Sequence, residues 1–537
     1  MTRPIGIPRA LLPLLPLLPL LPLLPQAAGG QAPPPRPTLV VFITVDQLRG
    51  DYLDRFGAQF TGGLARLKTG GAVFANASLD YAITETAPGH ATGMSGRFPR
   101  STGIVSNSLG VLDPQAPVIG GGGAPASPFR FRGSTLIDWM RARDPRSRAL
   151  SVSRKDRGAI LPLGRARQQA YWYASDGRFT TSTYYADTLP AWVRQFNARR
   201  LPHQYAGRSW TLLLPASSYP ERDSVAAENR GRDVGFPHVV PADSGLAARV
   251  LGNYPWMDQL TLDFALEGLE RLDLGRGSAV DLLAISLSTL DAVGHGFGPE
   301  SREVHDMVLR LDQMLGTFFD RLFQLRDSAG VIVALTGDHG VTSFPAVYTA
   351  RNGRPADYVD LSGAARMFQT MVAARGVDST AWMWEDGVLW VDRPAFSRAG
   401  VSADFAVREF VTAARADAGV LRVDQVRTLA QRDTTRDAIA RRWYHMIPPD
   451  MPIDVVVTLK PHYVWGNYGI AMHGQPSDDD ANVPVVFYGA PFKPGAYREA
   501  ARVVDLAPTL AAVLGISPTE RVDGRVLRAA LRSAGTD

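Results

Sequence analysis

The sequence predicts an α/β fold with a mostly parallel central sheet, helices on both faces and cap insertions. Two observations predict it. Continuous apolar runs of strand length, such as residues 38–45 and 280–287, are typical of buried parallel strands. These runs alternate with segments of helical period, such as residues 260–272 and 304–325. Strands that alternate with helices favour a parallel sheet that is covered on both faces.

The predicted core elements follow one another along the chain. Residues 38–45 (TLVVFITV) form the first strand, which ends in Asp46. The segment GGLARLKTGGAVF predicts a helix, a glycine stop and a second strand, and residues 84–92 (TETAPGHAT) predict a turn that opens a helix. The later expected elements are strands at 280–287, 331–335, 454–459 and 483–488, and helices at 260–272, 304–325 and 505–514.

Two stretches interrupt this alternation, and we interpret them as insertions that cap the sheet. The first is rich in Tyr, Trp, Arg and Pro, and the second mixes short strands with helices. The expected division is a signal peptide at 1–32, core at 33–161, a cap insertion at 162–255, core at 256–341, a second insertion at 342–450 and core at 451–537.

The first 32 residues have the pattern of a secretory signal. Arg3 and Arg9 precede a Leu/Pro run at 11–25, and small residues follow it, so that cleavage is expected after Ala27, Ala28 or Ala32. A low-complexity membrane anchor is the alternative, but the run is short and broken by proline. We therefore expect a periplasmic or secreted protein with no stable membrane span after cleavage.

The composition excludes several classes of site. The chain has no cysteine, which excludes a disulfide scaffold, a Cys-based zinc site and a thiol nucleophile. A formal charge of +5 on 537 residues, without a block of Lys and Arg, does not indicate nucleic acid as a specific partner. Any metal must be held by Asp, Glu and the nine histidines.

Several predicted strands end in residues that can bind a metal ion. Ligands bind at the carboxyl ends of the strands in open α/β sheets, so these side chains are expected at one edge. Each residue alone has an ordinary explanation, because an Asp after a strand is usually a turn former or a helix cap. Together they supply enough ligands for two three-ligand zinc sites, although such sites also accept other divalent ions. The candidates are Asp46, Asp291, His295, Asp338, His339 and His473.

Glycines beside these residues explain how adjacent side chains can face one point. The glycines of DAVGHGFGP predict a loop or short turn that aims Asp291 and His295 together. Gly337 and Gly340 flank the Asp-His pair of TGDHG, and they let the backbone bend so that both side chains reach one centre.

The order of these motifs resembles the alkaline phosphatase superfamily, and within it the secreted bacterial phosphatases that use a threonine nucleophile. The matching segments are Asp46, TETAPGHAT, SRKDRGA, DAVGHGFGP, TGDHG, MHGQP and the late DLAPTLAAVLG. The resemblance implies two zinc ions per chain. One would be held by Asp291, His295 and His473. The other would be held by Asp46, Asp338 and His339, together with the nucleophile Thr86.

A threonine hydroxyl is a poor nucleophile at neutral pH unless a metal ion lowers its pKa. The alternative role for Thr86 is a helix N-cap, which Thr84 could serve instead. His90 in the same motif is interpreted as structural, because the zinc ions would activate the nucleophile.

Three further residues bear on the substrate. In the resembling branch, residues matching Asn107, Lys155 and Arg157 grip the free oxygens of a phosphate monoester. The related nucleotide pyrophosphatase/phosphodiesterase branch lacks the Lys/Arg pair, so the pair favours monoesters over diesters. The alternative is that Lys155 and Arg157 are ordinary solvated charges. No residues for a third metal ion are identified, and Lys155 could stand in for it.

The predicted protein is an exported zinc-dependent alkaline phosphatase that hydrolyses small-molecule phosphate monoesters through a phosphothreonine. The first alternative is a phosphodiesterase or nucleotide pyrophosphatase on the same scaffold. The second alternative is a sulfate or phosphonate ester hydrolase. Thr86 and the absence of cysteine argue against a sulfatase, because the sulfatases of the superfamily use a modified Cys or Ser as nucleophile. A non-catalytic phosphate-binding protein is the third, against which the full ligand set argues. The sequence does not indicate an oligomeric state.

Overall fold

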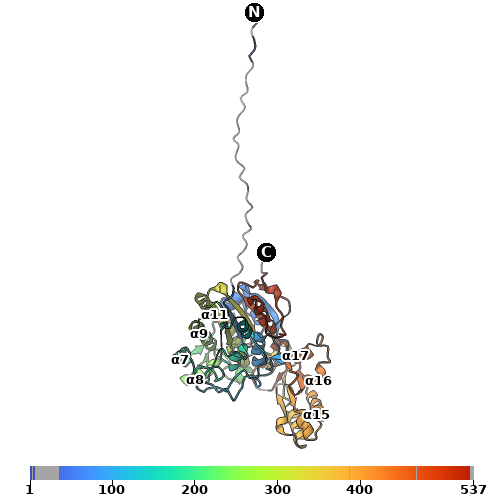
Figure 1. The fold of residues 1–537 in the computed structure, drawn as a ribbon. Coiled ribbons are helices and arrows are strands. Elements are labelled where there is room, and N and C mark those ends of the chain that lie inside the picture. Colours follow the sequence, from blue (N-terminus) through green and yellow to red (C-terminus); the bar gives the residue numbers. More distant parts are fainter. Residues whose placement is uncertain (3, 7–35, 386, 467–468, 533–537) are drawn as a thin grey trace.

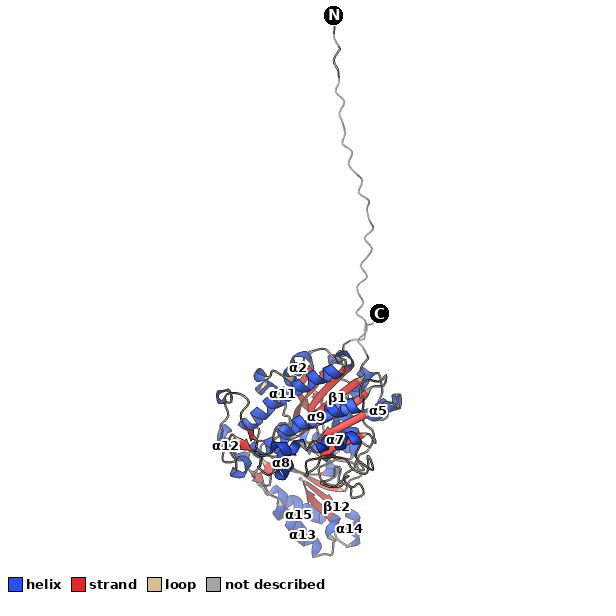
Figure 2. Ribbon diagram, turned by 90° about the vertical axis from the view of Figure 1, so that its left-hand side faces the viewer, coloured by secondary structure: helices blue, strands red, loops and turns tan. Residues whose placement is uncertain are grey.

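A ten-stranded sheet forms the centre of the computed structural model (Figures 1 and 2). Its main order is β17–β2–β16–β9–β1–β8–β3–β4–β5, with β18 beside β2. β16 is antiparallel to β2 and β9, β5 is antiparallel to β4, and the other neighbours are parallel. This confirms the predicted mostly parallel sheet. The strands are β1 (Leu39–Val45), β2 (Ala72–Ser78), β3 (Ala149–Ser153), β4 (Gln169–Tyr173), β5 (Phe179–Thr180), β8 (Asp281–Leu287), β9 (Val331–Gly337), β16 (Asn482–Tyr488), β17 (Gly495–Ala496) and β18 (Ala501–Arg502).

The structure describes all residues except 3, 7–35, 386, 467–468 and 533–537. The predicted signal run at 11–25 therefore lies outside the described residues. Within the described part of the chain, no helix is long and apolar enough to cross a membrane.

The central strand β1 shows why the sheet is covered on both sides. Val41 and Ile43 contribute to the apolar core on one face, whereas Val40 and Phe42 contribute to the core on the other. All four side chains are buried. A strand with two buried faces needs mostly apolar residues on both of them, and Thr44 is the one polar residue of β1.

Three helices, α2 (Gly63–Gly70), α9 (Trp256–Arg271) and α11 (Arg302–Leu325), cover one face, which is turned toward the viewer in Figure 2. On the opposite face lie α3 (Thr86–Ser95), α5 (Leu136–Arg143) and α19 (Leu506–Leu514). The remaining helices are α1 (Tyr52–Arg55), α4 (Pro99–Thr102), α6 (Asp156–Ile160), α7 (Ala191–Ala198), α8 (Ser244–Val250), α10 (Thr289–Phe297), α12 (Pro345–Asn352), α13 (Ser362–Ala373), α14 (Arg393–Arg398), α15 (Ala403–Arg415), α16 (Val426–Leu429), α17 (Ala438–Met446) and α18 (Asp478–Ala481).

A second sheet projects from the core as a separate lobe, seen at the lower right of Figure 1 and the bottom of Figure 2. Its order is β11–β12–β14–β13, and α13 and α15 pack on it. Its strands are β11 (Trp382–Glu385), β12 (Val388–Val391), β13 (Val420–Gln425) and β14 (Ile453–Leu459). Two short pairs, β6 (Ser209–Trp210) with β7 (His238–Val239) and β10 (Tyr358–Val359) with β15 (Val464–Trp465), complete the strands.

Two of the expected insertion boundaries need correction. The core was expected to resume at residue 451, but β14 pairs with β12 and β13, so the second insertion continues through this strand. The cap insertion was expected to begin at residue 162, but β4 and β5 extend the central sheet. Their aromatic residues pack against α9, where the rings of Phe179 and Phe264 stack with centroids 4.2 Å apart. Sixty-eight residues separate Val388 of β12 from its partner Val456 of β14, so local pattern could not assign that pairing. β4 pairs with β3 only 19 residues earlier, and there the unusual composition of the stretch obscured the strand.

Candidate active site

The predicted site residues meet at one edge of the central sheet. Asp46 directly follows β1, and the pair Asp338 and His339 directly follows the neighbouring β9. β8, on the other side of β1, leads into α10, which carries Asp291 and His295. These strands are parallel and in register, so their carboxyl ends coincide.

His473 reaches the same edge by a different route. It lies in the loop before β16, which is antiparallel to β9. The amino-terminal end of an antiparallel strand lies beside the carboxyl end of its partner. The loop before β16 therefore meets the residues that follow β9.

Asp46, Asp338 and His339 form one group, hereafter the buried cluster. All three side chains have no exposed surface. His339 Nε2 lies 3.4 Å from Asp46 Oδ1 and 3.8 Å from Asp338 Oδ2. Neither Asp46 Oδ1 nor His339 Nε2 has a hydrogen-bond partner among the described residues. Buried polar atoms without partners are costly, and a bound cation would satisfy these.

Asp291, His295 and His473 form a second group, hereafter the open cluster. Asp291 Oδ1 lies 3.2 Å from His295 Nε2 and 3.6 Å from His473 Nε2, and the two Nε2 atoms are 3.2 Å apart. Ligands of a tetrahedral zinc ion at 2.0–2.1 Å are separated by about 3.3 Å, so this spacing fits such an ion. The predicted loop at Asp291 and His295 is instead the helix α10, where positions four apart lie on one face.

The histidines of both clusters are oriented in the same way. The Nδ1 atoms of His295, His339 and His473 lie 2.6, 2.9 and 2.8 Å from the carbonyl oxygens of Ala471, Gly340 and Thr84. A carbonyl oxygen only accepts, so each Nδ1 carries a proton, and Nε2 is the atom of each ring that is left for a metal ion. Metal-binding histidines are commonly held by this arrangement.

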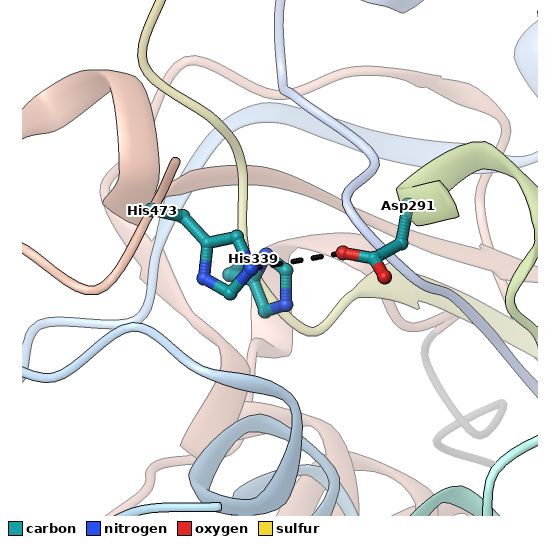
Figure 3. A group of neighbouring side chains, drawn as sticks. All are labelled: Asp291, His339 and His473. Carbon is teal, nitrogen blue, oxygen red and sulfur yellow. Dashed lines mark ion pairs between the residues drawn. The ribbon is translucent and has the colours of Figure 1, made fainter. Parts of the chain in front are cut away.

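The two clusters adjoin each other. The rings of His339 and His473 stack with centroids 3.7 Å apart. Figure 3 shows these two imidazoles beside Asp291, and ligand atoms of all three residues lie within 4.8 Å of one another. Two cations bound here would therefore be neighbours.

Charges in the site adjust the protonation of these ligands. Burial raises the pKa of Asp291, but the charges of Lys155 and His295 outweigh it and hold this pKa well below its ordinary value. Burial and the neighbouring His339 lower the pKa of His473 to about 3. Burial also lowers the pKa of His339, but the Asp338 and Asp46 carboxylates outweigh it and raise this pKa to about 9. Metal ions bind ionised carboxylates and neutral imidazoles, so Asp291 and His473 are held in the binding form, whereas His339 must lose a proton when a metal ion binds.

Thr86 is the first residue of α3 and is buried. Glu85 occupies the N-cap position of α3, so neither Thr86 nor Thr84 is the helix cap that the sequence offered as an alternative. Thr86 lies inside the helix, and the Thr84 hydroxyl donates to the carbonyl of Gln475 at 3.1 Å. A side chain at Gly89 would overlap the backbone of Asp338, so glycine lets α3 pack directly against the end of β9.

Lys155 reaches both clusters and the threonine. Its Nζ lies 2.6 Å from Asp46 Oδ2 and 2.7 Å from Asp291 Oδ2, and it donates to Thr86 Oγ1 at 3.2 Å. The side chain is largely buried. It is therefore not an ordinary solvated charge.

Asn107 also lies beside the threonine. Its amide oxygen accepts the backbone N–H of Ala87 at 2.9 Å, and its backbone N–H donates to Glu85 Oε2 at 2.7 Å. The NH₂ group of Asn107 is thus left to donate elsewhere. Arg157 lies farther out, with its Nη1 3.5 Å from Asp156 Oδ1, and its charge acts on Glu85 by lowering a pKa that burial raises.

His90, interpreted as structural, occupies the interior of the site. Its Nδ1 lies 2.9 Å from the carbonyl oxygen of Thr86 and 3.1 Å from Asp338 Oδ2, and its Nε2 lies 2.8 Å from Ser286 Oγ. The ring thus fixes the first turn of α3 against the end of β9.

Two site residues were not identified from the sequence. Gln47 contacts a carboxylate of each cluster, and Glu85 holds the Asn107 backbone. Each directly precedes or follows a predicted site residue in the chain, and that adjacency was the one available signal.

Comparisons with known proteins identify relatives of this chain. The family described as type I phosphodiesterase/nucleotide pyrophosphatase matches residues 40–464. Alkaline phosphatase PhoV of Synechococcus elongatus is 32% identical over 526 residues, which are 92% of each chain. Alkaline phosphatase PhoK of a Sphingomonas species is 30% identical over 538 residues, 91% of each chain.

A solved structure has the same fold. The crystal structure of wild-type alkaline phosphatase PafA, a protein of Elizabethkingia meningoseptica, superposes with a TM-score of 0.85 at 28% identity and covers 93% of this chain and 99% of its own. A PafA variant in which one threonine, one asparagine, one lysine and one arginine are replaced has also been solved, and it superposes equally well.

Proposed function

This chain belongs to the type I phosphodiesterase/nucleotide pyrophosphatase family and is an alkaline phosphatase, and we propose that it hydrolyses phosphate monoesters at two zinc ions through a phosphothreonine at Thr86. The observation that carries the proposal is the pair of adjoining three-ligand clusters, with Lys155 in contact with both and with the Thr86 hydroxyl.

The ligand chemistry fits zinc. The buried cluster offers two carboxylates and one imidazole, and the open cluster offers one carboxylate and two imidazoles. Three protein ligands leave a position for substrate or nucleophile. When bound, the two ions would supply positive charge that lowers the pKa of the Thr86 hydroxyl and stabilises the departing ester oxygen.

The residues of the chain then carry out two displacements. Thr86 gives its hydroxyl proton to solvent, and its Oγ1 forms a bond to phosphorus as the bond from phosphorus to the ester oxygen breaks. That oxygen takes a proton from water and leaves as an alcohol. Water next attacks the phosphothreonine. The bond between phosphorus and Thr86 Oγ1 breaks, inorganic phosphate is released, and Thr86 regains its proton.

Asn107, Lys155 and Arg157 are proposed to hold the phosphoryl group during both steps. Negative charge spreads over three equatorial oxygens in such a transfer. Lys155 Nζ lies 3.2 Å from Thr86 Oγ1. The amide oxygen of Asn107 already accepts the Ala87 N–H, so the orientation of the amide is fixed and its NH₂ group can donate to the phosphoryl oxygens. The four residue types replaced in the PafA variant support this set. Their threonine and asparagine are 21 residues apart and their lysine and arginine two apart, as are Thr86 and Asn107, and Lys155 and Arg157.

A phosphodiesterase is the second candidate, and the description of the matching family favours it. The two functions differ in what they need beside the nucleophile. A monoester presents charged oxygens to Lys155, whereas a diester places a neutral substituent on one of them. The buried position of Lys155 supports the monoester.

The test compares three substrates with the zinc-loaded protein: an aryl phosphate, a bis-aryl phosphate and an aryl sulfate. We expect kcat/KM to be highest for the aryl phosphate and activity to disappear after chelation. A higher value for the bis-aryl phosphate would make the protein a phosphodiesterase. Full activity in metal-free protein would reject the mechanism.

Export to the periplasm or medium is proposed from the Arg-flanked Leu/Pro run. The mature chain should begin between Ala28 and Pro33. Amino-terminal sequencing of protein recovered from the native host tests this, and an intact Met1 would reject it.

A further inference from the structure

Gln47 occupies a special place between the two clusters. It follows Asp46 directly, is 1% exposed, and has a φ of +67°. This region of backbone space is unfavourable for a residue with a long side chain and is readily adopted by glycine and asparagine. Gln47 therefore holds a strained backbone conformation at the centre of the site.

Its backbone contacts the buried cluster. The Gln47 N–H donates to Asp338 Oδ1 at 3.1 Å. The other oxygen of this carboxylate, Oδ2, is the one that faces His339 Nε2. The backbone bond thus fixes the orientation of Asp338 and leaves Oδ2 for a cation.

Its side chain contacts the open cluster. Gln47 Nε2 donates to Asp291 Oδ1 at 2.9 Å. This is the oxygen that faces His295 Nε2 and His473 Nε2. A carboxylate oxygen accepts only, so the amide nitrogen and not the amide oxygen must face it. One lone pair of Asp291 Oδ1 is used by the amide, and the other remains for a cation.

The side chain packs closely against α10. A Cβ atom at Gly294 on α10 would overlap Gln47 Oε1, so glycine there admits the amide against the helix. Gly294 lies within the turn that separates Asp291 from His295.

We propose that Gln47 is a positioning residue that orients one carboxylate of each metal site, its backbone acting on the buried cluster and its side chain on the open cluster. This inference rests on the proposed zinc sites. Hydrogen-bond partners of metal ligands typically contribute about 10–100-fold in metal affinity. Removing the side chain should weaken the open cluster alone, because the backbone N–H survives every replacement except proline.

The test uses Gln47→Gly and Gln47→Asn. Both residues suit a positive φ, and neither carries an amide that reaches Asp291, because asparagine is one methylene shorter. Metal-free protein is titrated with zinc against a chromogenic chelator, and thermal unfolding of the metal-free protein is recorded. His295→Ala, with the open cluster incomplete, identifies which binding step belongs to the buried cluster. Gln59→Leu, which removes the amide of a half-buried glutamine that bonds Ser218 and His305, is the matched control.

We expect both Gln47 variants to unfold at the wild-type temperature or above. Their open-cluster zinc affinity should fall about 10–100-fold while the buried-cluster affinity stays within about twofold. Excess zinc should restore most of the activity. Gln59→Leu should leave both affinities unchanged.

Unchanged affinity of both steps in the Gln47 variants, or equal loss in both, would overturn the inference and leave the proposed function standing. Wild-type protein that binds no zinc would instead overturn the proposed function itself.

Discussion

The two clusters differ most in their access to solvent. The side chains of the buried cluster have no exposed surface, whereas the His295 side chain of the open cluster is 25% exposed. The ligands of the buried cluster follow β1 and β9 directly, and those of the open cluster lie on α10 and in the loop before β16. The ends of two strands enclose one site, whereas a helix and a loop form the other.

This difference in exposure indicates where the nucleophile and the leaving group lie in the proposed reaction. Thr86 belongs to the interior, because α3 packs against the end of β9. A leaving group must enter and depart, and the open cluster is the side that reaches solvent. Elements near the open cluster are therefore expected to shape substrate choice.

The largest effect is expected from the nucleophile. Thr86→Ala should lower kcat for an aryl phosphate by about 10³-fold or more, because the covalent step is lost, while both clusters keep their zinc. Thr86→Ser should retain much of the activity. Steady-state kinetics with metal analysis measures this, and Thr92→Ala, which removes a buried hydroxyl from the same helix, is the control. Phosphate trapped on another residue would show that Thr86 is misassigned.

Chelation should separate the clusters in time. We expect zinc to leave the open cluster in a first, faster phase and the buried cluster in a second, slower phase, since the chelator can approach only the exposed ligands. Activity should disappear with the first phase. Stopped samples analysed for zinc and for hydrolysis test this, and simultaneous loss of both ions would remove the distinction between the clusters.

The phosphoryl-binding residues should affect substrates unequally. Lys155→Ala and Asn107→Ala should each lower kcat/KM for an aryl monoester by about 10²-fold and for the matched diester much less, because only the monoester presents two charged oxygens. Arg157→Ala should follow the same direction. Lys493→Ala, at an exposed position, is the control. Equal proportional losses on both substrates would favour the phosphodiesterase.

The smallest effect concerns an insertion that packs beside the open cluster. Glu228 begins a short helical turn (Glu228–Gly231) against α10, and burial together with Glu303 raises its pKa to about 9. Between about pH 4.5 and 9 the folded protein retains a proton that the unfolded chain releases, so stability falls as pH rises.

Glu228→Gln should therefore raise the free energy of unfolding by about 1–3 kcal/mol at pH 8 and change it little at pH 4.5. Urea unfolding at both pH values measures this, with the exposed Glu499→Gln as control. An equal change at both pH values would mean that the proton on Glu228 is not responsible.

The strands of the core were predictable because burial on both faces requires a run of mostly apolar residues, which is visible in the local sequence. Residues 38–45, 280–287 and 331–335 are continuous apolar runs, and each forms a central strand. The same kind of run at 454–459 forms β14 in the other sheet. A high apolar content indicates that a strand is buried, but it does not indicate which strand lies beside it.

The site divides in a similar way. Ligand types at strand ends identified the clusters, because carboxylates and imidazoles are chemically distinctive. The glycines around His295 predicted a loop, but packing of α10 against its neighbours maintains a helix there. Gln47 could not be found, because its function depends on Asp291, which is 244 residues away.

The late position of His473 in the chain has a consequence for incomplete polypeptides. Because the loop before β16 carries His473, the open cluster has no third ligand until almost the whole polypeptide has been made. A nascent chain that already contains Asp46, Thr86 and His339 has every ligand of the buried cluster but cannot yet assemble the second centre. Premature termination before residue 473 would therefore yield a fragment that lacks one ligand of the proposed second metal site.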